Sequence, residues 1–321
     1  MIKTLYKKTL KSISPSISIT IPTFDRVENL LKLLLHISQE RNLDQVEIIL
    51  LDNKSPSVID IKIIKKYFKN TNFFYYQNSF HLGPDVNYLK SIELANSEWV
   101  YPIGDSKIPK KGFISMILRD IKKYKDCMSI VYSYASKLKK NLIINTIYEI
   151  DSKKIHFGDF FLGGTSIISR KNVEHYLSQA GQITLSRMPH SLFHLKPLLD
   201  HKKIVLNKEK IIETFLKKPA HYDPKLSFLE CWAQFALIDF ITSDTKARKI
   251  LNKKIFEVYG EIWRFGYHAL HKLFIKRIDI SSNIDRIIKF RYIHYNRLFD
   301  LPVIYLIFII SKVLKIIKYV K

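Results

Sequence analysis

The first third of the chain contains four strongly apolar runs, and each of them stops at a cluster of small polar and acidic residues. With their polar ends, the runs occupy residues 16–26, 46–55, 72–85 and 98–107. Stretches with helical spacing of apolar residues separate them, so each cluster is expected at the carboxyl end of a strand. Ligands bind at that edge of an open α/β sheet. Polar residues from four loops are therefore predicted to converge on one site.

The same alternation predicts an α/β fold. Strands are expected at 18–22, 46–51, 72–77 and 99–103, and helices at 27–38, 57–69, 85–95 and 112–124. Because crossovers between such units are right-handed, the sheet is expected to be mostly parallel. A smaller antiparallel part is expected from strands at 130–136, 142–149 and 165–169, and later helices at 226–241 and 246–272.

These patterns predict four parts in the chain of 321 residues. They are a basic leader at 1–15, a catalytic α/β domain at 16–215, a helical region at 216–299 and an amphipathic tail at 300–321. The leader lacks the continuous apolar stretch of a secretory signal, so the protein is not expected to be exported. Two distant cysteines, Cys127 and Cys231, favour a reducing cytoplasm over a disulfide framework or a zinc site.

The tail combines a charge-free stretch with regularly spaced lysines. Residues 301–310 carry no charge, and lysines recur at every third position from Lys312 to Lys321. A bilayer span needs about 20 apolar residues, which is more than this stretch offers. An amphipathic helix lying on the inner face of the cell membrane is expected, and a terminal helix packed on the core is the alternative.

Lysine and arginine outnumber aspartate and glutamate by 53 to 29, which gives a formal net charge of +24. Such a balance implies an anionic partner, namely nucleic acid, a phosphorylated substrate or an anionic membrane surface. A lysine-rich composition without functional meaning is the alternative. No nucleic acid partner is expected, because the chain lacks Gly-aromatic RNA motifs, zinc spacings and a separate helix-turn-helix signal.

The four polar clusters resemble motifs of glycosyltransferase family 2, the nucleotide-diphosphosugar transferases of the GT-A fold, in its bacterial surface-polysaccharide branch. The resemblance covers residues 16–170. In order along the chain, its motifs read IPTFDR, LLDNKSP, QNSFHLGPDVN and WVYPIGDSK. It implies a Rossmann-like sheet with a smaller antiparallel part, a nucleotide-diphosphate sugar as donor, and inverting transfer to an acceptor.

Residues of the first two motifs suit a nucleoside diphosphate. Asp52 can accept hydrogen bonds from a uracil imide or a ribose hydroxyl, with Asn53 and Ser55 shaping the turn. The resemblance implies that Thr23 and Asp25 contact the same nucleoside, and Arg26 offers a cationic fork for phosphate. The alternatives are a plain turn at Asp52, and a helix N-cap with a solvated neighbour at Asp25 and Arg26.

The third motif contributes a glycine and the start of a helix. Gly83 permits close backbone approach or a positive φ. Asp85 and Asn87 open the following helix, where donor binding and simple capping are both consistent with the sequence. The resemblance places all three among the donor-binding residues.

The fourth motif departs from the family. The family's acidic run holds a divalent cation, Mn²⁺ or Mg²⁺, against the pyrophosphate, whereas this chain reads Asp105-Ser106-Lys107. Asp105 is the predicted metal-binding and catalytic residue, yet one carboxylate is a poor site for a hard cation. Three alternatives stay open. The enzyme binds metal weakly through Asp105, phosphates and waters; it works without metal through Lys107 and Arg26; or it has lost activity.

Inverting transfer needs a base that deprotonates the acceptor hydroxyl. The candidates are Asp159, Glu174 and the pair His190 and His194, whose spacing would place both histidines on one helix face. His190 and Asp159 are retained as predicted catalytic residues, and a structural role is the alternative for each.

The expected function is that of a hexosyltransferase-type enzyme. It would move a sugar from a nucleotide-diphosphate donor, expected to be a UDP-sugar, to a glycan or lipid-diphosphate-linked acceptor in capsule or lipopolysaccharide synthesis. The eroded acidic motif supports one alternative, a catalytically inactive binding or scaffold protein with the same fold.

Overall fold

The computed structural model describes residues 2–10, 14–134, 136–153, 155–160, 162–182, 189–216 and 241–259. The chain divides into two compact units, Met1–Tyr222 and Asp223–Lys321. The site lies in the first unit. Of the second unit, the structure describes residues 241–259. Helix α10 (Thr245–Tyr259) begins one residue before the helix predicted at 246–272 and otherwise lies within it.

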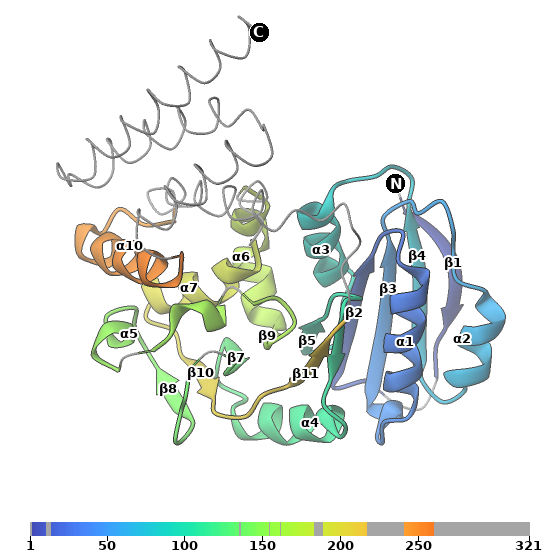
Figure 1. The fold of residues 1–321 in the computed structure, drawn as a ribbon, viewed down its shortest axis with the longest axis horizontal. Helices are drawn as coiled ribbons and strands as arrows, with labels where there is room; N and C mark the ends of the chain where they lie inside the picture. The colour runs from blue at the N-terminus through green and yellow to red at the C-terminus, as the bar shows by residue number, and fades with distance from the viewer. Residues whose placement is uncertain are drawn as a thin grey trace, which may run out of the picture. The chain divides into compact units, whose positions relative to one another are not determined.

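Nine strands of the described residues form one sheet, in the spatial order β1-β4-β3-β2-β5-β9-β7-β10-β8 (Figure 1). They are β1 (Ile2–Lys8), β2 (Ile17–Thr23), β3 (Val46–Asp52), β4 (Asn72–Asn78), β5 (Trp99–Pro102), β7 (Ser129–Tyr132), β8 (Leu142–Ile144), β9 (Ser166–Ser169) and β10 (Ile204–Asn207). The run β4-β3-β2-β5 is parallel throughout. Strands β1, β9 and β8 are antiparallel to their neighbours. The predicted α/β class, with a parallel part and a smaller antiparallel part, is confirmed.

Helices cover both faces of this sheet. On one face α1, α2 and α4 share a buried apolar cluster with alternate residues of the parallel strands, and Figure 1 shows α1 in front of β3. On the other face α3 contacts β2, β3 and β5 and also packs against α6, which in turn packs against α7. The helices are α1 (Val27–Ser38), α2 (Ile61–Tyr67), α3 (Pro84–Glu93), α4 (Phe113–Lys123), α5 (Glu149–Ser152), α6 (Arg170–Gln182) and α7 (Leu192–Leu199).

The apolar runs explain the centre of the sheet. All seven residues of β3 are buried, as expected for a strand covered by helices on both faces. Glu47 of β3 and Ser18 of β2 can be buried there because they satisfy each other. The Ser18 hydroxyl donates to the Glu47 carboxylate at 2.7 Å. The predicted helix at 27–38 coincides with α1, whereas the helix predicted at 57–69 is shorter, since α2 begins only after its N-cap Asp60.

The sequence misplaced part of the antiparallel region. The segments predicted at 130–136 and 142–149 overlap β7 and β8, and β10, which was not predicted, lies between these two strands in the sheet. The second segment leaves the sheet after Ile144 and enters α5. The residues predicted as a basic leader contain β1, which pairs antiparallel with β4 and extends the sheet.

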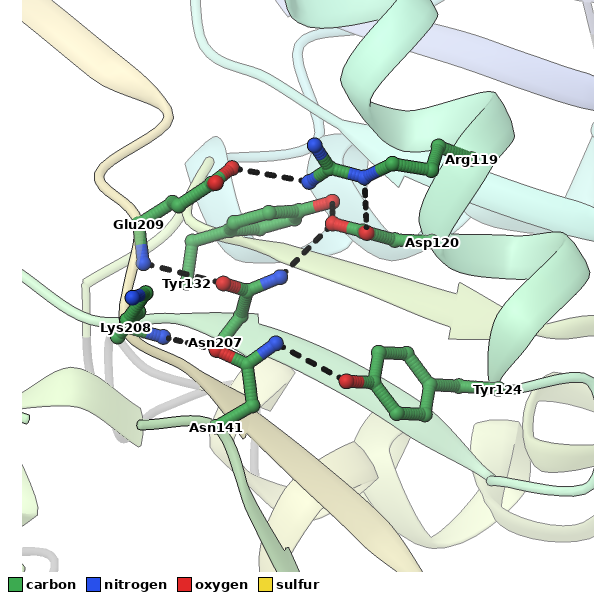
Figure 2. A network of polar contacts seen from close by, with 8 residues as sticks. All are labelled: Arg119, Asp120, Tyr124, Tyr132, Asn141, Asn207, Lys208 and Glu209. Atoms are coloured by element: carbon green, nitrogen blue, oxygen red, sulfur yellow. Dashed lines mark hydrogen bonds and ion pairs between the residues drawn. The ribbon is translucent and has the colours of Figure 1, made fainter. Parts of the chain in front are cut away.

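A second, two-stranded sheet pairs β6 (Lys107–Pro109) with β11 (Ile212–Phe215). Figure 2 shows the polar network that ties the segment before β11 to α4. The buried Asp120 carboxylate accepts hydrogen bonds from the Asn207 amide at 2.7 Å and the Tyr132 hydroxyl at 2.9 Å. It also accepts one from Arg119 at 2.9 Å, and Arg119 pairs with Glu209. This network holds residues 207–209 in place just before the chain enters β11, the partner strand of β6.

The predicted helix at 226–241 and the amphipathic tail at 300–321 lie outside the described residues, apart from the last residue of that helix. Within the described residues, no helix has the length and apolar character that a membrane crossing requires.

Candidate functional site

The carboxyl ends of the parallel strands bring residues from distant parts of the chain to one edge. Thr23 ends β2 opposite Asp52, which ends β3, and Gln77 of β4 lies opposite Asp52 on its other side. The Asn53 amide donates to the Thr23 carbonyl at 2.9 Å, so the loops after β2 and β3 begin side by side. The loop after β5 adds Asp105 to the same edge through its contact with Thr23.

Asp105 is held by two donors from the first loop. The Thr23 hydroxyl donates to its Oδ2 at 2.7 Å, and the Arg26 guanidinium donates to its Oδ1 at 3.1 Å. The carboxylate is 3% exposed, and burial raises its pKa. The charge of Arg26, the hydrogen bonds from Thr23 and Arg26, and the charge of Lys107 oppose that rise. The positive charges of both Arg26 and Lys107 therefore act on Asp105.

Asp52 organises the second loop. Its Oδ1 accepts a hydrogen bond from the Ser55 amide at 2.9 Å, and its Oδ2 accepts one from the Gln77 amide at 2.9 Å. The Ser55 hydroxyl also donates to Asp52 and accepts from the Asp25 amide at 2.8 Å. Asp25 adopts a positive φ of 51°. The turn role considered for Asp52 is thus present, and the residue is 1% exposed at the carboxyl edge of the sheet.

Three buried asparagines join the second loop to the third. Asn53 accepts hydrogen bonds from the Asn78 side chain at 3.1 Å and from the Leu82 amide at 2.9 Å, and it donates to the Gly83 carbonyl at 3.2 Å. Asn78 also donates to Asn87 at 2.8 Å. Gly83 has a φ of 79° and precedes α3. This arrangement fixes the turn before the helix.

Asp85 lies in the first turn of α3, where a carboxylate is favourable next to the positive end of the helix dipole. Its side chain is partly exposed at the same edge as Gly83. The capping alternative for Asp85 is therefore consistent with its position.

Lys107 extends from β6 along a glycine turn formed by Gly163 and Gly164. A Cβ atom placed on Gly164 would lie 3.0 Å from the Lys107 Cδ, and one placed on Gly163 would lie 3.7 Å from both the Lys107 Nζ and the His190 ring. The Tyr101 hydroxyl donates to the Gly164 carbonyl at 3.0 Å, which fixes the turn from the side of β5. The missing side chain at Gly164 thus makes room for the Lys107 chain, and both Lys107 and His190 border Gly163.

The other base candidates have different surroundings. The Asp159 carboxylate is 1% exposed and accepts hydrogen bonds from the amides of Tyr134 at 2.8 Å and Ser136 at 3.1 Å. Glu174 pairs with Arg170 at 3.3 Å on α6. These contacts are structural, and they give Asp159 an anchoring role for the chain after β7.

The two histidines do not share one helix face, because a short 3-10 turn (Pro189–Ser191) carries His190 and α7 carries His194. The His194 ring lies 3.1 Å from the Ser129 hydroxyl, and burial lowers its pKa to about 3. His190 instead has its ring centroid 5.5 Å from that of Tyr88 in α3. Of the pair, His190 is the one that borders the Gly163 turn together with Lys107.

Sequence comparison identifies the family. Residues 18–177 match the model of glycosyl transferase family 2. The chain belongs to glycosyltransferase family 2. Within it, 105 residues are 36% identical to the abequosyltransferase RfbV of Salmonella typhimurium, a match that spans 32% of this chain and 31% of that protein. The chain thus matches about a third of the length of this curated relative.

Solved structures support the GT-A fold of this family 2 member. Residues 1–349 of S. aureus TarS in complex with UDP-GlcNAc align with a TM-score of 0.65 at 15% identity, covering 89% of this chain and 83% of that one. The mannosyltransferase PcManGT from Pyrobaculum calidifontis, in complex with GDP-Man and Mn²⁺, aligns with a TM-score of 0.56 at 9% identity, covering 94% and 87%. At these identities the likeness shows the fold.

The side chains around Asp105 do not fit a divalent cation. Its two oxygens already accept hydrogen bonds from Thr23 and Arg26, and Lys107 adds a second positive charge nearby. Hard cations prefer several oxygen ligands. In the part of the chain that the structure describes, no group of three or more histidines, cysteines or carboxylates could hold a metal ion. The family's metal therefore lacks a protein ligand set among these residues.

Sequence reasoning missed three residues of the site. Gln77 and Asn78 are the last two residues of β4 and open the third motif, so the rule that selected Asp52 at the end of β3 could have found them. Tyr101 lies inside β5 and supports Gly164 from 63 residues away, so no local pattern reveals it.

Proposed function

We propose that this chain is a glycosyltransferase that moves a sugar from a nucleoside-diphosphate donor to a glycan or lipid-diphosphate-linked acceptor in surface-polysaccharide synthesis. The observation that carries the proposal is the convergence of Thr23, Arg26, Asp52 and Asp105 at the carboxyl edge of a family 2 domain. The partial match to an abequosyltransferase supports the class of pathway. Action at the inner face of the cell membrane stays a prediction from residues 300–321.

In this proposal the donor occupies the carboxyl edge of the sheet, where the loops after β2, β3 and β5 meet. Asp52, which is 1% exposed and fixed by Ser55 and Gln77, supplies the carboxylate that accepts a further hydrogen bond from a base imide or a ribose hydroxyl. Arg26 presents a planar guanidinium suited to phosphate oxygens. UDP is the expected nucleotide.

The transfer proceeds with inversion. The acceptor oxygen attacks the anomeric carbon while the bond to the diphosphate breaks, and the acceptor proton passes to a base. Of the two predicted bases, His190 has the more suitable surroundings, because it lies beside Gly163 and Lys107. The Asp159 carboxylate accepts two backbone amides instead.

Calorimetry on the full chain with UDP, GDP and CDP tests the proposal. Binding of one nucleoside diphosphate is expected, with weaker binding by Asp52→Asn and unchanged binding by the exposed control Asp44→Asn. If none of the three binds to the wild-type chain, the proposal is wrong. Binding without turnover of any matching nucleotide sugar would favour the scaffold alternative. If the wild type does turn over a nucleotide sugar, His190→Gln should lower kcat by about 10² or more, the usual contribution of a general base.

A further inference from the structure

The cationic surroundings of Asp105 lead to an inference that rests on the proposed function. Two positive side chains, Arg26 and Lys107, act on this single carboxylate. These three side chains together therefore carry a net positive charge. A site for a divalent cation needs the reverse, an excess of carboxylate oxygen. The sign of the local charge therefore suits the pyrophosphate itself rather than a metal ion.

Arg26 is fixed on one side of this group. Its guanidinium donates to Asp105 Oδ1, and the same carboxylate is held from the other side by Thr23. The Arg26 side chain keeps 26% of its surface exposed, whereas that of Asp105 keeps 4%. Since a guanidinium has five donors, Arg26 can bind Asp105 and phosphate oxygens at the same time.

Lys107 is guided by its strand and by the glycine turn. It lies opposite Phe215 in the pairing of β6 with β11, and the Leu216 amide donates to the Ser106 carbonyl at 2.8 Å. Its aliphatic chain passes Gly164, where a Cβ atom would lie at 3.0 Å. The glycine turn thereby confines the Lys107 side chain, so less side-chain entropy is lost when its ammonium binds an anion.

We propose that Arg26 and Lys107 together take the place of the divalent cation, binding the donor pyrophosphate and stabilising the leaving nucleoside diphosphate, so that transfer proceeds without metal. When the bond between the anomeric carbon and the phosphate oxygen breaks, its electron pair stays on the diphosphate. The two cations remain protonated and neutralise that charge, as preorganised charges do in other active sites. The acceptor oxygen forms the new bond, and its proton leaves to the base.

The test measures binding of UDP, GDP and CDP to the full chain by calorimetry, in excess EDTA and then with Mn²⁺ or Mg²⁺. The same affinity is expected in all conditions for the nucleotide that binds. Lys107→Ala should weaken it by about tenfold to a hundredfold, the size of one charge-assisted hydrogen bond. Lys107→Arg should retain most of it, and the exposed control Lys111→Ala should match the wild type.

A second variant and a turnover assay complete the test. Lys107→Asp places a second carboxylate beside Asp105, so nucleotide binding in EDTA should be lost and should return with Mn²⁺. The wild type should transfer sugar from the matching nucleotide sugar at the same rate in EDTA as with Mn²⁺ or Mg²⁺. Thermal melting of each variant checks that it folds.

The outcomes separate the two proposals. If wild-type binding or turnover disappears in EDTA and returns with Mn²⁺, the metal-free inference is overturned while the transferase assignment stands. The inference is also overturned if Lys107→Ala binds the nucleotide as tightly as the wild type. If no nucleoside diphosphate binds in any condition, the proposed function itself falls.

Discussion

The Thr23 hydroxyl donates a 2.7 Å hydrogen bond to the Asp105 carboxylate, although 82 residues separate the two in sequence. The bond joins the loops after β2 and β5, which are adjacent parallel strands. Both side chains are buried, so neither group can replace the other with bulk water. The first and fourth sequence motifs thus form one physical unit.

Removing that hydroxyl should destabilise the fold. Thr23→Val keeps the shape of the side chain but leaves one oxygen of the buried Asp105 without its donor. We expect the free energy of unfolding to fall by about 1–3 kcal/mol, the cost of an unsatisfied buried polar group. Urea denaturation measures it. Thr4→Val on the exposed side of β1 is the matched control, and equal stability of the two variants would contradict the expectation.

The buried His194 predicts a loss of stability in acid. Burial lowers its pKa to about 3 in the folded state, against an ordinary value of 6.5. Between these values the unfolded chain binds the proton and the folded chain does not, so the stability contributed by this group falls as pH decreases. The slope is about 1.4 kcal/mol per pH unit below pH 6.5.

Urea denaturation at several pH values checks this effect. His194→Gln should show a shallower decline between pH 6 and 4 than the wild type, since glutamine does not titrate. The exposed His175→Gln should keep the wild-type slope. An unchanged slope in His194→Gln would show that other groups cause the acid sensitivity.

The central sheet could be predicted because its signals are local. The apolar runs at 18–22 and 46–51 are found within β2 and β3, and the helix at 27–38 coincides with α1. Burial on both faces leaves few polar positions inside such a strand, so its end is visible as the first polar cluster. That is why Thr23 and Asp52 could be placed at one edge from sequence.

The remainder depends on contacts that no local pattern encodes. Strand β10 has four residues and enters the sheet between β7 and β8, and no pattern in the sequence predicted a strand there. His190 and His194 have helical spacing, yet a turn ends between them, so His194 packs beside Ser129 while His190 packs against Tyr88. Such outcomes are decided by packing between distant segments.

The glycine turn offers a matched pair of substitutions. Gly164 has a φ of 83°, and a Cβ atom there would lie 3.0 Å from the Lys107 Cδ, whereas one on Gly163 would make only ordinary contacts at 3.7 Å. We expect Gly164→Ala to lower the free energy of unfolding by about 1–2 kcal/mol, the cost of a left-handed backbone for a residue with a Cβ. Gly163→Ala should be neutral or slightly stabilising, because it restricts the unfolded chain.

Chemical denaturation of both alanine variants makes this comparison. The difference between them matters more than either value, since both variants change the unfolded chain in the same way. If Gly163→Ala were the less stable of the two, the turn would not have the conformation described.

The network in Figure 2 predicts that a distant carboxylate supports the strand opposite Lys107. Asp120 accepts three hydrogen bonds, and an asparagine in its place must turn its NH₂ group toward Arg119 or toward Tyr132 and Asn207. In either orientation one hydrogen-bond acceptor is lost, and the NH₂ group of the asparagine faces a donor of a neighbouring side chain. We expect Asp120→Asn to lower the free energy of unfolding by about 1–3 kcal/mol.

Hydrogen exchange tests whether this loss reaches β11. Because Asn207 and Glu209 are held by the network just before β11 begins, the amides of Ile212–Phe215 should exchange faster in Asp120→Asn than in the wild type. Glu209→Gln breaks only the exposed ion pair with Arg119 and should change stability by at most about 1 kcal/mol. Unchanged exchange at β11 in Asp120→Asn would mean that pairing with β6 alone holds that strand, and that Lys107 depends on its glycine turn rather than on the network.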